Sequence, residues 1–311
     1  MMKHIGRKLP QLLLVMLGAS FLTFSLSYMS PGDPAEMMFE ARGMSPTQEA
    51  LDEARERMGL NSPFIVQYGK WLGNIVTGDL GISYTTNGPV SDVLKRKIPM
   101  TLKLAAAALV FLVFFSLIFG VFSALYRNRI PDFLIRGGSF AGISVPDFWL
   151  GLILIYLFVV KINWFRITDP YAPSSVILPG LTLAIPLIGR YTRQIRAAIL
   201  EELSKDYVIG ARARGIRETG IVFAHVLPNA LTGLLTLFGL STALLLGGTV
   251  IVETIFSWPG LGSMAMEAIT LRDYPLLQSY VILMAFIYVM ISFLVDLITQ
   301  LIDPRVREQN Q

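Results

Sequence analysis

Long apolar stretches alternate with short polar segments along this chain. A helix needs roughly 20 apolar residues to cross the ~30 Å hydrocarbon layer of a bilayer. The pattern predicts six such helices, at residues 9–29, 100–126, 138–160, 176–200, 230–255 and 279–302. The fourth stretch contains Pro179 and Pro186, so we expect a kink there. The pattern therefore predicts an all-α integral membrane protein with six transmembrane helices.

Basic residues beside the predicted spans indicate the orientation, because cytoplasmic loops are enriched in Lys and Arg. They lie before the first span, between the second and third, between the fourth and fifth, and after the last. With six spans these regions share one side, so both termini are expected in the cytoplasm. The opposite short loops hold only Lys161, Arg166 and Arg272. The first apolar run is too long for a cleaved signal peptide, and no Ala-x-Ala pattern follows it.

Four regions follow from this arrangement. They are a cytoplasmic N-terminus with the first helix at 1–29, an external segment at 30–99, a five-helix core at 100–303 that includes a cytoplasmic loop at 201–228, and a cytoplasmic tail at 304–311. In the external segment a short helix is expected from Ser45 and Pro46 to Gly59, and a second from Ser62 and Pro63. This segment either packs as a small cap or receives a partner.

Composition supports a membrane protein. The chain is 53% hydrophobic and 15% charged, whereas soluble domains carry about 25% charged residues. The net charge of +4 comes from short basic clusters beside apolar runs, which is typical of a membrane face, so no nucleic-acid partner is expected. The absence of cysteine excludes disulfides and thiolate metal sites. His4 and His225 lie far apart, and the methionines are spread among apolar runs, so no metal site is expected.

A short basic segment, SKDYVIGARARGIRETG at 204–220, separates the fourth and fifth predicted spans. Ser204 is a candidate N-cap, and Gly215 ends the helix or permits close approach of another backbone. Tyr207 and Ala211 would share one side by helical spacing. Taken alone, these residues fit a docking helix less well than a positively charged loop that only sets the topology.

The order of residues in GARARGIRETGIVFAHVLPNAL resembles the cytoplasmic loop signature of binding-protein-dependent ABC importer permeases. Gly215 takes the glycine position, and Leu227 with Pro228 takes the Leu-Pro position. Ile209 and Gly210 replace the glutamate and the first alanine of the Glu-Ala-Ala element. Further segments resemble the dipeptide, oligopeptide and nickel branch of this family, in the order SPGDPA, LGISY, SVPDFWLG, GGTVIVETIFSWPGLG, RDYPLLQ and DPRVR.

The resemblance implies the fold of a type I-like ABC importer and the function of its membrane-spanning permease subunit. Such a subunit moves nickel or other metal chelates, or short peptides, across the inner membrane by ATP-driven alternating access. The implied partners are a homologous second permease, two cytoplasmic ABC ATPase subunits or domains, and an external substrate-binding protein. The basic loop would form a coupling helix on the ATPase, with Tyr207, Ala211, Arg212, Arg214 and Gly215 as the expected contact residues.

The chain contains no Gly-x-x-x-x-Gly-Lys-Ser/Thr phosphate-binding loop. It is therefore expected to be a transport subunit without enzymatic activity or a cofactor of its own. ATP and Mg would be bound by the partner ATPase subunits.

Candidates for the transport path or a gate lie near the end of the fifth span. Glu253 is an ionisable residue in an apolar stretch, which favours the path, but an interfacial structural role is equally open. Gly247 and Gly248 permit either close helix contact or a bend. Trp258 and Pro259, in SWPGLG, resemble the family's external gate loop, although Trp258 also fits a membrane-interface anchor.

The competing function is a secondary transporter driven by an ion gradient. Such transporters are built from internal repeats with broken helices and carry carboxylates near the bilayer midplane. The sequence shows no convincing internal repeat and few such carboxylates. A membrane enzyme is disfavoured as well, because no His, Ser, Asp and Glu residues converge at catalytic spacing.

Overall fold

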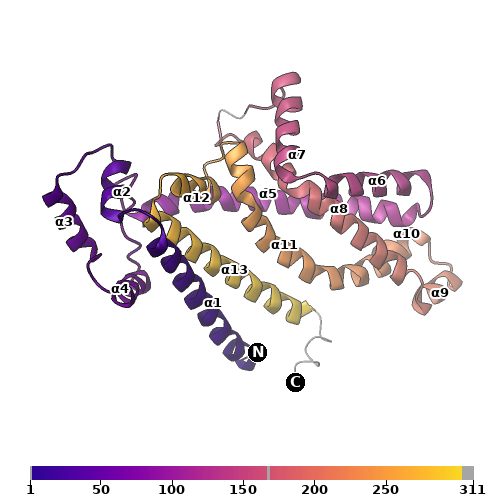
Figure 1. Cartoon of the computed structure of the whole chain (residues 1–311). Helices are drawn as coiled ribbons and strands as arrows, with labels where there is room; N and C mark the ends of the chain where they lie inside the picture. Colours follow the sequence, from indigo (N-terminus) through magenta and orange to yellow (C-terminus); the bar gives the residue numbers. More distant parts are fainter. Residues whose placement is uncertain (1, 167–168, 303–311) are drawn as a thin grey trace. The chain divides into compact units, whose positions relative to one another are not determined.

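A computed structural model of the protein describes residues 2–166 and 169–302. The described residues form helices and no strand, apart from an isolated bridge between Ile82 and Pro89. The predicted all-α fold is confirmed (Figure 1). The tail predicted at 304–311 lies outside the described residues.

The chain divides into two compact units, one of Met1–Thr101 and Pro259–Met290 and the other of Leu102–Trp258 and Ile291–Gln311. Unit 1 holds α1 (Met2–Met29), α2 (Pro34–Ala41), α3 (Gln48–Met58), α4 (Phe64–Val76), α12 (Leu261–Thr270) and the first parts of α5 (Val90–Leu125) and α13 (Tyr274–Ile302). Unit 2 holds the remainder of α5 and α13 with α6 (Ile130–Ser144), α7 (Asp147–Leu154), η1 (Ile155–Lys161), η2 (Pro173–Val176), α8 (Ile177–Glu202), α9 (Asp206–Ala213), α10 (Glu218–Gly220), η3 (Ile221–Val226) and α11 (Leu227–Ile255).

Several of these helices are long and apolar enough to cross a membrane. Four pass by length and composition, at Leu12–Met29, Val90–Leu125, Pro173–Glu202 and Tyr274–Val295. A bent pair, α6 with α7 and η1, makes a fifth if it is one span. Helix α11 has 29 residues and covers the predicted fifth span, but its described apolar stretch is only Leu244–Ile255. The count of six spans therefore stays a prediction.

The third predicted span, 138–160, is not one straight helix. Helix α6 ends at Ser144, Val145 is extended, and α7 begins after Pro146 at an angle of 108° to α6. Proline disfavours the helical conformation of the residue before it, which explains the break at Val145. Hydropathy depends on residue type and not on backbone direction, so the apolar run at 138–160 gave no sign of this bend.

The helix boundaries predicted within residues 30–99 are partly confirmed. Helix α3 begins at Gln48, where Thr47 Oγ1 accepts a hydrogen bond from the Ala50 backbone N–H at 3.3 Å. The predicted start at Ser45 and Pro46 was two residues early, because Thr47 supplies the cap instead. The predicted stop at Gly59 is confirmed by its left-handed conformation, with φ of 69°.

A buried carboxylate holds together two distant segments of unit 1. Asp273, at the start of α13, accepts hydrogen bonds from Ser83 Oγ at 2.6 Å and from Thr85 Oγ1 at 2.8 Å. Its second oxygen accepts from the Leu276 backbone N–H at 3.4 Å. Burial, followed by the charge of Asp273, raises the pKa of the neighbouring Tyr84 phenol. The motifs LGISY and RDYPLLQ therefore meet in one polar cluster.

Helix α8 is the central helix of unit 2, and α6, α7 and α11 pack against it (Figure 1). The contact with α6 is close at Gly189, where a Cβ would lie 2.5 Å from the backbone oxygen of Ser139. The contact with α5 is close at Gly120, where a Cβ would lie 2.6 Å from Ile195 Cγ2. Glycine allows such near-backbone packing between membrane helices.

A buried ion pair joins three of these helices. Asp132, at the start of α6, is fully buried and accepts two hydrogen bonds from Arg196 of α8, both of 2.8 Å. It also accepts from Ser123 Oγ of α5 at 2.5 Å and from the Asn128 backbone N–H at 2.9 Å. A bidentate pair with further donors meets the requirement for placing charge in a low-dielectric interior.

We expect Gly189→Ala to destabilise the protein, because its new methyl group would push the α6 backbone away from α8. Gly137→Ala is the matched control on α6, since nothing lies within 4 Å of a Cβ at that position. Thermal unfolding in detergent should show a lower midpoint for Gly189→Ala and an equal or higher midpoint for Gly137→Ala. Equal midpoints for the two variants would contradict the close packing described above.

We expect Asp132→Ala to cost about 3–5 kcal/mol, because Arg196 would then be buried without its partner. The double variant Asp132→Ala with Arg196→Met should lose clearly less than the sum of the single variants. Unfolding in a denaturing detergent titration measures all three values. Additive losses would show that the two side chains do not interact.

Candidate functional site: an exposed loop helix and two adjoining cavities

Helix α9 is the short basic helix predicted between the fourth and fifth spans. It begins at Asp206, four residues after α8 ends at Glu202, and Ser204 does not cap it as predicted. Ser204 Oγ instead donates to the Glu201 backbone oxygen at 2.6 Å. The predicted stop at Gly215 is confirmed, because this residue has φ of 76° and its N–H donates to the Arg212 oxygen at 2.9 Å.

The two sides of α9 differ in burial. Val208 and Ala211 are buried in the core of unit 2, among residues that include Ile199, Ile221 and Val226. Ala211, predicted as a contact for a partner, therefore points into this chain and is only 2% exposed. The small side chain at that position permits α9 to pack closely on the end of α8 and on η3.

The outer side of α9 carries the residues available to a partner. Ile209 is 58% exposed, Gly210 is exposed, and Tyr207 is 37% exposed. Ile209 was not among the predicted contact residues. The spacing could have identified it, because an isoleucine next to Val208 must lie outside the stripe formed by Val208 and Ala211.

Polar contacts stiffen this loop. Arg212 Nε donates to Glu218 Oε1 of α10 at 2.6 Å, and this pairing raises the pKa of Arg212. Tyr207 Oη donates to Glu202 Oε2 at 2.9 Å, and Arg214 Nε donates to the Gly210 oxygen at 3.3 Å. Exposed ion pairs stabilise by at most about 1 kcal/mol each, so their main effect is to restrict the loop's conformations.

The predicted gate residues are buried. Glu253 and Trp258 are at most 1% exposed, and the Trp258 backbone N–H donates to the Glu253 oxygen at 2.8 Å. Lys103 Nζ lies 5.4 Å from the centre of the Trp258 ring, within cation–π range. Glu253 lines neither of the two cavities of unit 2 described next, so its role in the path stays a prediction. Pro259 is partly exposed.

The two predicted glycines of α11 lie in different surroundings. Gly247 is exposed, and nothing lies within 4 Å of a Cβ built on it. Gly248 lines a cavity of about 320 Å³ between α7, α8 and α11. The lining consists of Ile143, Asp147, Leu183, Pro186, Leu187, Arg190, Leu244, Leu245 and Gly248.

A second cavity of about 770 Å³ adjoins the first, with Ile143 and Arg190 lining both. Its remaining lining residues come from α6 and α8, and they are Arg136, Phe140, Arg193, Gln194, Arg196 and Ala197. The arginines of this cavity were not predicted as functional residues, because in the sequence they look like ordinary basic residues on the cytoplasmic side.

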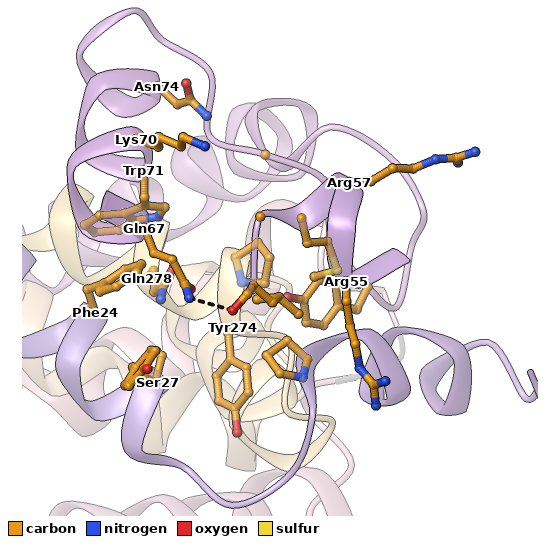
Figure 2. Close-up of a pocket in the computed structure, with 18 of the residues that line it drawn as sticks. Phe24, Ser27, Arg55, Arg57, Gln67, Lys70, Trp71, Asn74, Tyr274 and Gln278 are labelled. Carbon is orange, nitrogen blue, oxygen red and sulfur yellow. Dashed lines mark hydrogen bonds between the residues drawn. The ribbon is translucent and has the colours of Figure 1, made fainter. Parts of the chain in front are cut away.

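Unit 1 has a pocket of about 630 Å³ (Figure 2). Figure 2 shows that its lining comes from α1, α3, α4 and α13, with Phe24, Arg55, Trp71 and Gln278 among the labelled side chains. Gln67 Nε2 donates to two backbone oxygens there, at 2.7 and 2.9 Å. Among the described residues, no group of three or more His, Cys, Asp and Glu could hold a metal ion.

Comparison with protein families gives two matches that cover most of the chain. The family described as "Binding-protein-dependent transport system inner membrane component" matches residues 116–308. Its N-terminal counterpart, described as "Binding-prot-dependent transport system membrane comp, N-term", matches residues 1–105.

Curated relatives match over nearly the full length. A di/tripeptide transport system permease protein, DppB of Pseudomonas aeruginosa (strain UCBPP-PA14), is 38% identical over 99% of this chain and 100% of its own length. The metal-staphylopine import system permease protein CntB of Staphylococcus aureus (strain NCTC 8325 / PS 47) is 35% identical over 99% of both chains. The glutathione transport system permease protein GsiC of Escherichia coli (strain K12) is 34% identical over 99% of both chains.

Solved structures share the fold. An inward-facing conformation of the MetNI methionine ABC transporter aligns with a TM-score of 0.58 and 19% identity, over 68% of this chain and 96% of that chain. Another crystal form of the same transporter aligns with a TM-score of 0.56, also at 19% identity and over the same shares of the two chains. The type of fold predicted from the sequence is thereby confirmed.

Proposed function

Because the chain belongs to the family of binding-protein-dependent transport system inner membrane components, and is thus the membrane-spanning permease of an ABC importer, we propose that its cargo is a short peptide or a metal chelate. The observation that supports this is full-length similarity to permeases named for di/tripeptides, glutathione and metal–staphylopine. All three cargo names denote small molecules. The ion-gradient alternative finds no support, since the family that matches this chain is described as binding-protein-dependent.

Energy for transport comes from partner proteins in this proposal. The chain lacks the Gly-x-x-x-x-Gly-Lys-Ser/Thr loop, so ATP and Mg are bound by two cytoplasmic ABC ATPase subunits or domains. A homologous second permease completes the membrane part, and an external binding protein delivers the cargo. Both termini of this chain lie in the cytoplasm, on the same side as α9.

Helix α9 couples the ATPases to the membrane helices. Its inner side is fixed to unit 2 by Val208 and Ala211, while Ile209 and Gly210 are exposed for docking. A helix held on one side and free on the other can pass a displacement to the helices that hold it. Closure of the ATPases then moves the end of α8 and exchanges the two access states of the path.

Uptake by the assembled transporter tests the cargo. Proteoliposomes are prepared with this chain, its partner permease and the ATPases, and the binding protein is added. They should accumulate a labelled di- or tripeptide or a metal chelate only when ATP and Mg are present on the side of the membrane that the ATPases face. Replacing ATP by ADP is the control, because it leaves binding intact but supplies no energy. Uptake that follows an ion gradient without ATP would refute the proposal.

Crosslinking tests the coupling role of α9. The chain has no native cysteine, so Ile209→Cys introduces a single reactive thiol on the exposed side. It should crosslink to a cysteine placed in the surface groove of the ATPase, with a yield that changes when ATP is added. Ala211→Cys is the matched control and should give little product, because that position is buried in this chain.

The contrast between these two positions gives the test its force. Equal yields at both positions would show that α9 does not dock with its outer side. Absence of any crosslink from Ile209→Cys, in a folded and membrane-inserted complex, would show that the loop only sets the topology.

A further inference from the structure

Arg190 lies in the middle of a helix that is long and apolar enough to span the membrane. Helix α8 runs from Ile177 to Glu202, so Arg190 stands 12 residues before its end, roughly 18 Å at 1.5 Å per residue. Enrichment of basic residues on the cytoplasmic side applies to loops and helix ends. A charged side chain inside a spanning helix faces a water-filled cavity or a charged partner.

The surroundings of Arg190 point to a cavity. Arg190, Arg193, Gln194 and Ala197 follow each other at helical spacing on one side of α8, and all four line the 770 Å³ cavity. Arg136 reaches the same cavity from α6. The packing of α6 on α8 thus brings arginines from two helices around one space.

The charge of this cavity is not balanced by the described residues. Asp132 neutralises Arg196, but within the described part of the chain Arg136, Arg190 and Arg193 form no ion pair. Arg193 stacks over the Phe140 ring at 4.8 Å, which leaves the edge of its guanidinium group able to donate hydrogen bonds. The described residues that line this cavity include no carboxylate.

One hydrogen-bond acceptor in the lining also lacks a partner. The buried Oε1 atom of Gln194 accepts no hydrogen bond from any described residue. An arginine cluster calls for an anion, whereas an amide oxygen calls for an N–H donor. A ligand that carries a carboxylate next to an N–H group satisfies both requirements.

The smaller cavity extends this site toward α7 and α11. It shares Arg190 with the larger cavity and contains Asp147 as its other charged residue. The 320 Å³ cavity is thus lined by one positive and one negative side chain, whereas the charged residues that line the 770 Å³ cavity are all arginines. A carboxylate that enters the first space is drawn toward the second.

We propose that Arg136, Arg190 and Arg193 form an anion-binding section of the transport path, and that this section binds the carboxylate of the cargo in transit. This inference rests on the proposed function and adds the chemical group that the path recognises. Arginine suits the task because its planar group can hold a carboxylate by two parallel hydrogen bonds. Headgroups of anionic lipids carry the same charge, so the experiments below separate them from a carboxylate of the cargo.

Thiol reactivity measures the charge preference of this section. The Ala197→Cys variant places the chain's single cysteine in the 770 Å³ cavity. The assembled transporter, in nanodiscs of neutral lipid, is treated with an anionic sulfonatoethyl and a cationic trimethylammonium methanethiosulfonate reagent. The ratio of the anionic to the cationic rate should exceed by about tenfold the ratio for Thr86→Cys, an exposed position in unit 1.

Charge removal shows which residues set this ratio. Adding Arg190→Gln and Arg193→Gln to Ala197→Cys should lower the ratio about tenfold. Adding Arg127→Gln and Arg129→Gln, which removes two exposed charges that line neither cavity, should leave it unchanged. An equal effect of both pairs would overturn the proposal, because the ratio would then report only the net charge.

Protection of the thiol identifies the ligand. Dialanine should slow the reaction of Ala197→Cys, and dialanine amide, which lacks the carboxylate, should not. Protection that depends on phosphatidylglycerol in the nanodisc, and not on the peptide, would overturn the proposal in favour of a lipid headgroup. ATP hydrolysis stimulated by the binding protein is measured on the same samples, because it reports the proposed function independently of the anion preference.

Discussion

The buried pair of Asp132 and Arg196 is the interaction on which unit 2 depends. A fully buried carboxylate is costly unless hydrogen bonds and an opposite charge surround it, and here α5, the turn before α6, and α8 together supply them. The pair therefore fixes three helices at one point, two turns before α8 ends. Helix α9 follows α8 after a short turn, so the contact that positions α8 also helps to position α9.

Helix α8 meets different requirements on its different sides. Gly189 permits close approach of α6, and Tyr191 stacks on Phe238 of α11 with ring centres 4.7 Å apart. The Tyr191 hydroxyl also forms a hydrogen bond with the hydroxyl of Ser241, which lies on α11 as well. The side with Arg190 and Arg193 borders the cavities, and Arg193 also contacts Phe140 of α6. One helix thus holds the fold of unit 2, lines the proposed path and leads into the proposed coupling element.

Unit 1 uses the same physical solution with different residues. Asp273 is buried, and its hydrogen bonds come from Ser83 and Thr85, about 190 positions earlier in the chain. Both aspartates sit beside the first turn of a helix, where a negative charge is favourable. In a chain with so few charged residues, these two buried carboxylates hold together segments that apolar packing alone would leave free to slide.

The sequence by itself determined the helical class, the approximate spans, the exposed basic loop and the family, because apolar run length and motif order are properties of the chain alone. Only the tertiary structure decided that Ala211 faces inward and Ile209 outward, that Pro146 bends the third span, and that the arginines of α6 and α8 surround one cavity. These features depend on which side of a helix meets a neighbour. Periodicity shows which residues share a side of a helix, but only the packing of helices distant in the chain determines which side is buried.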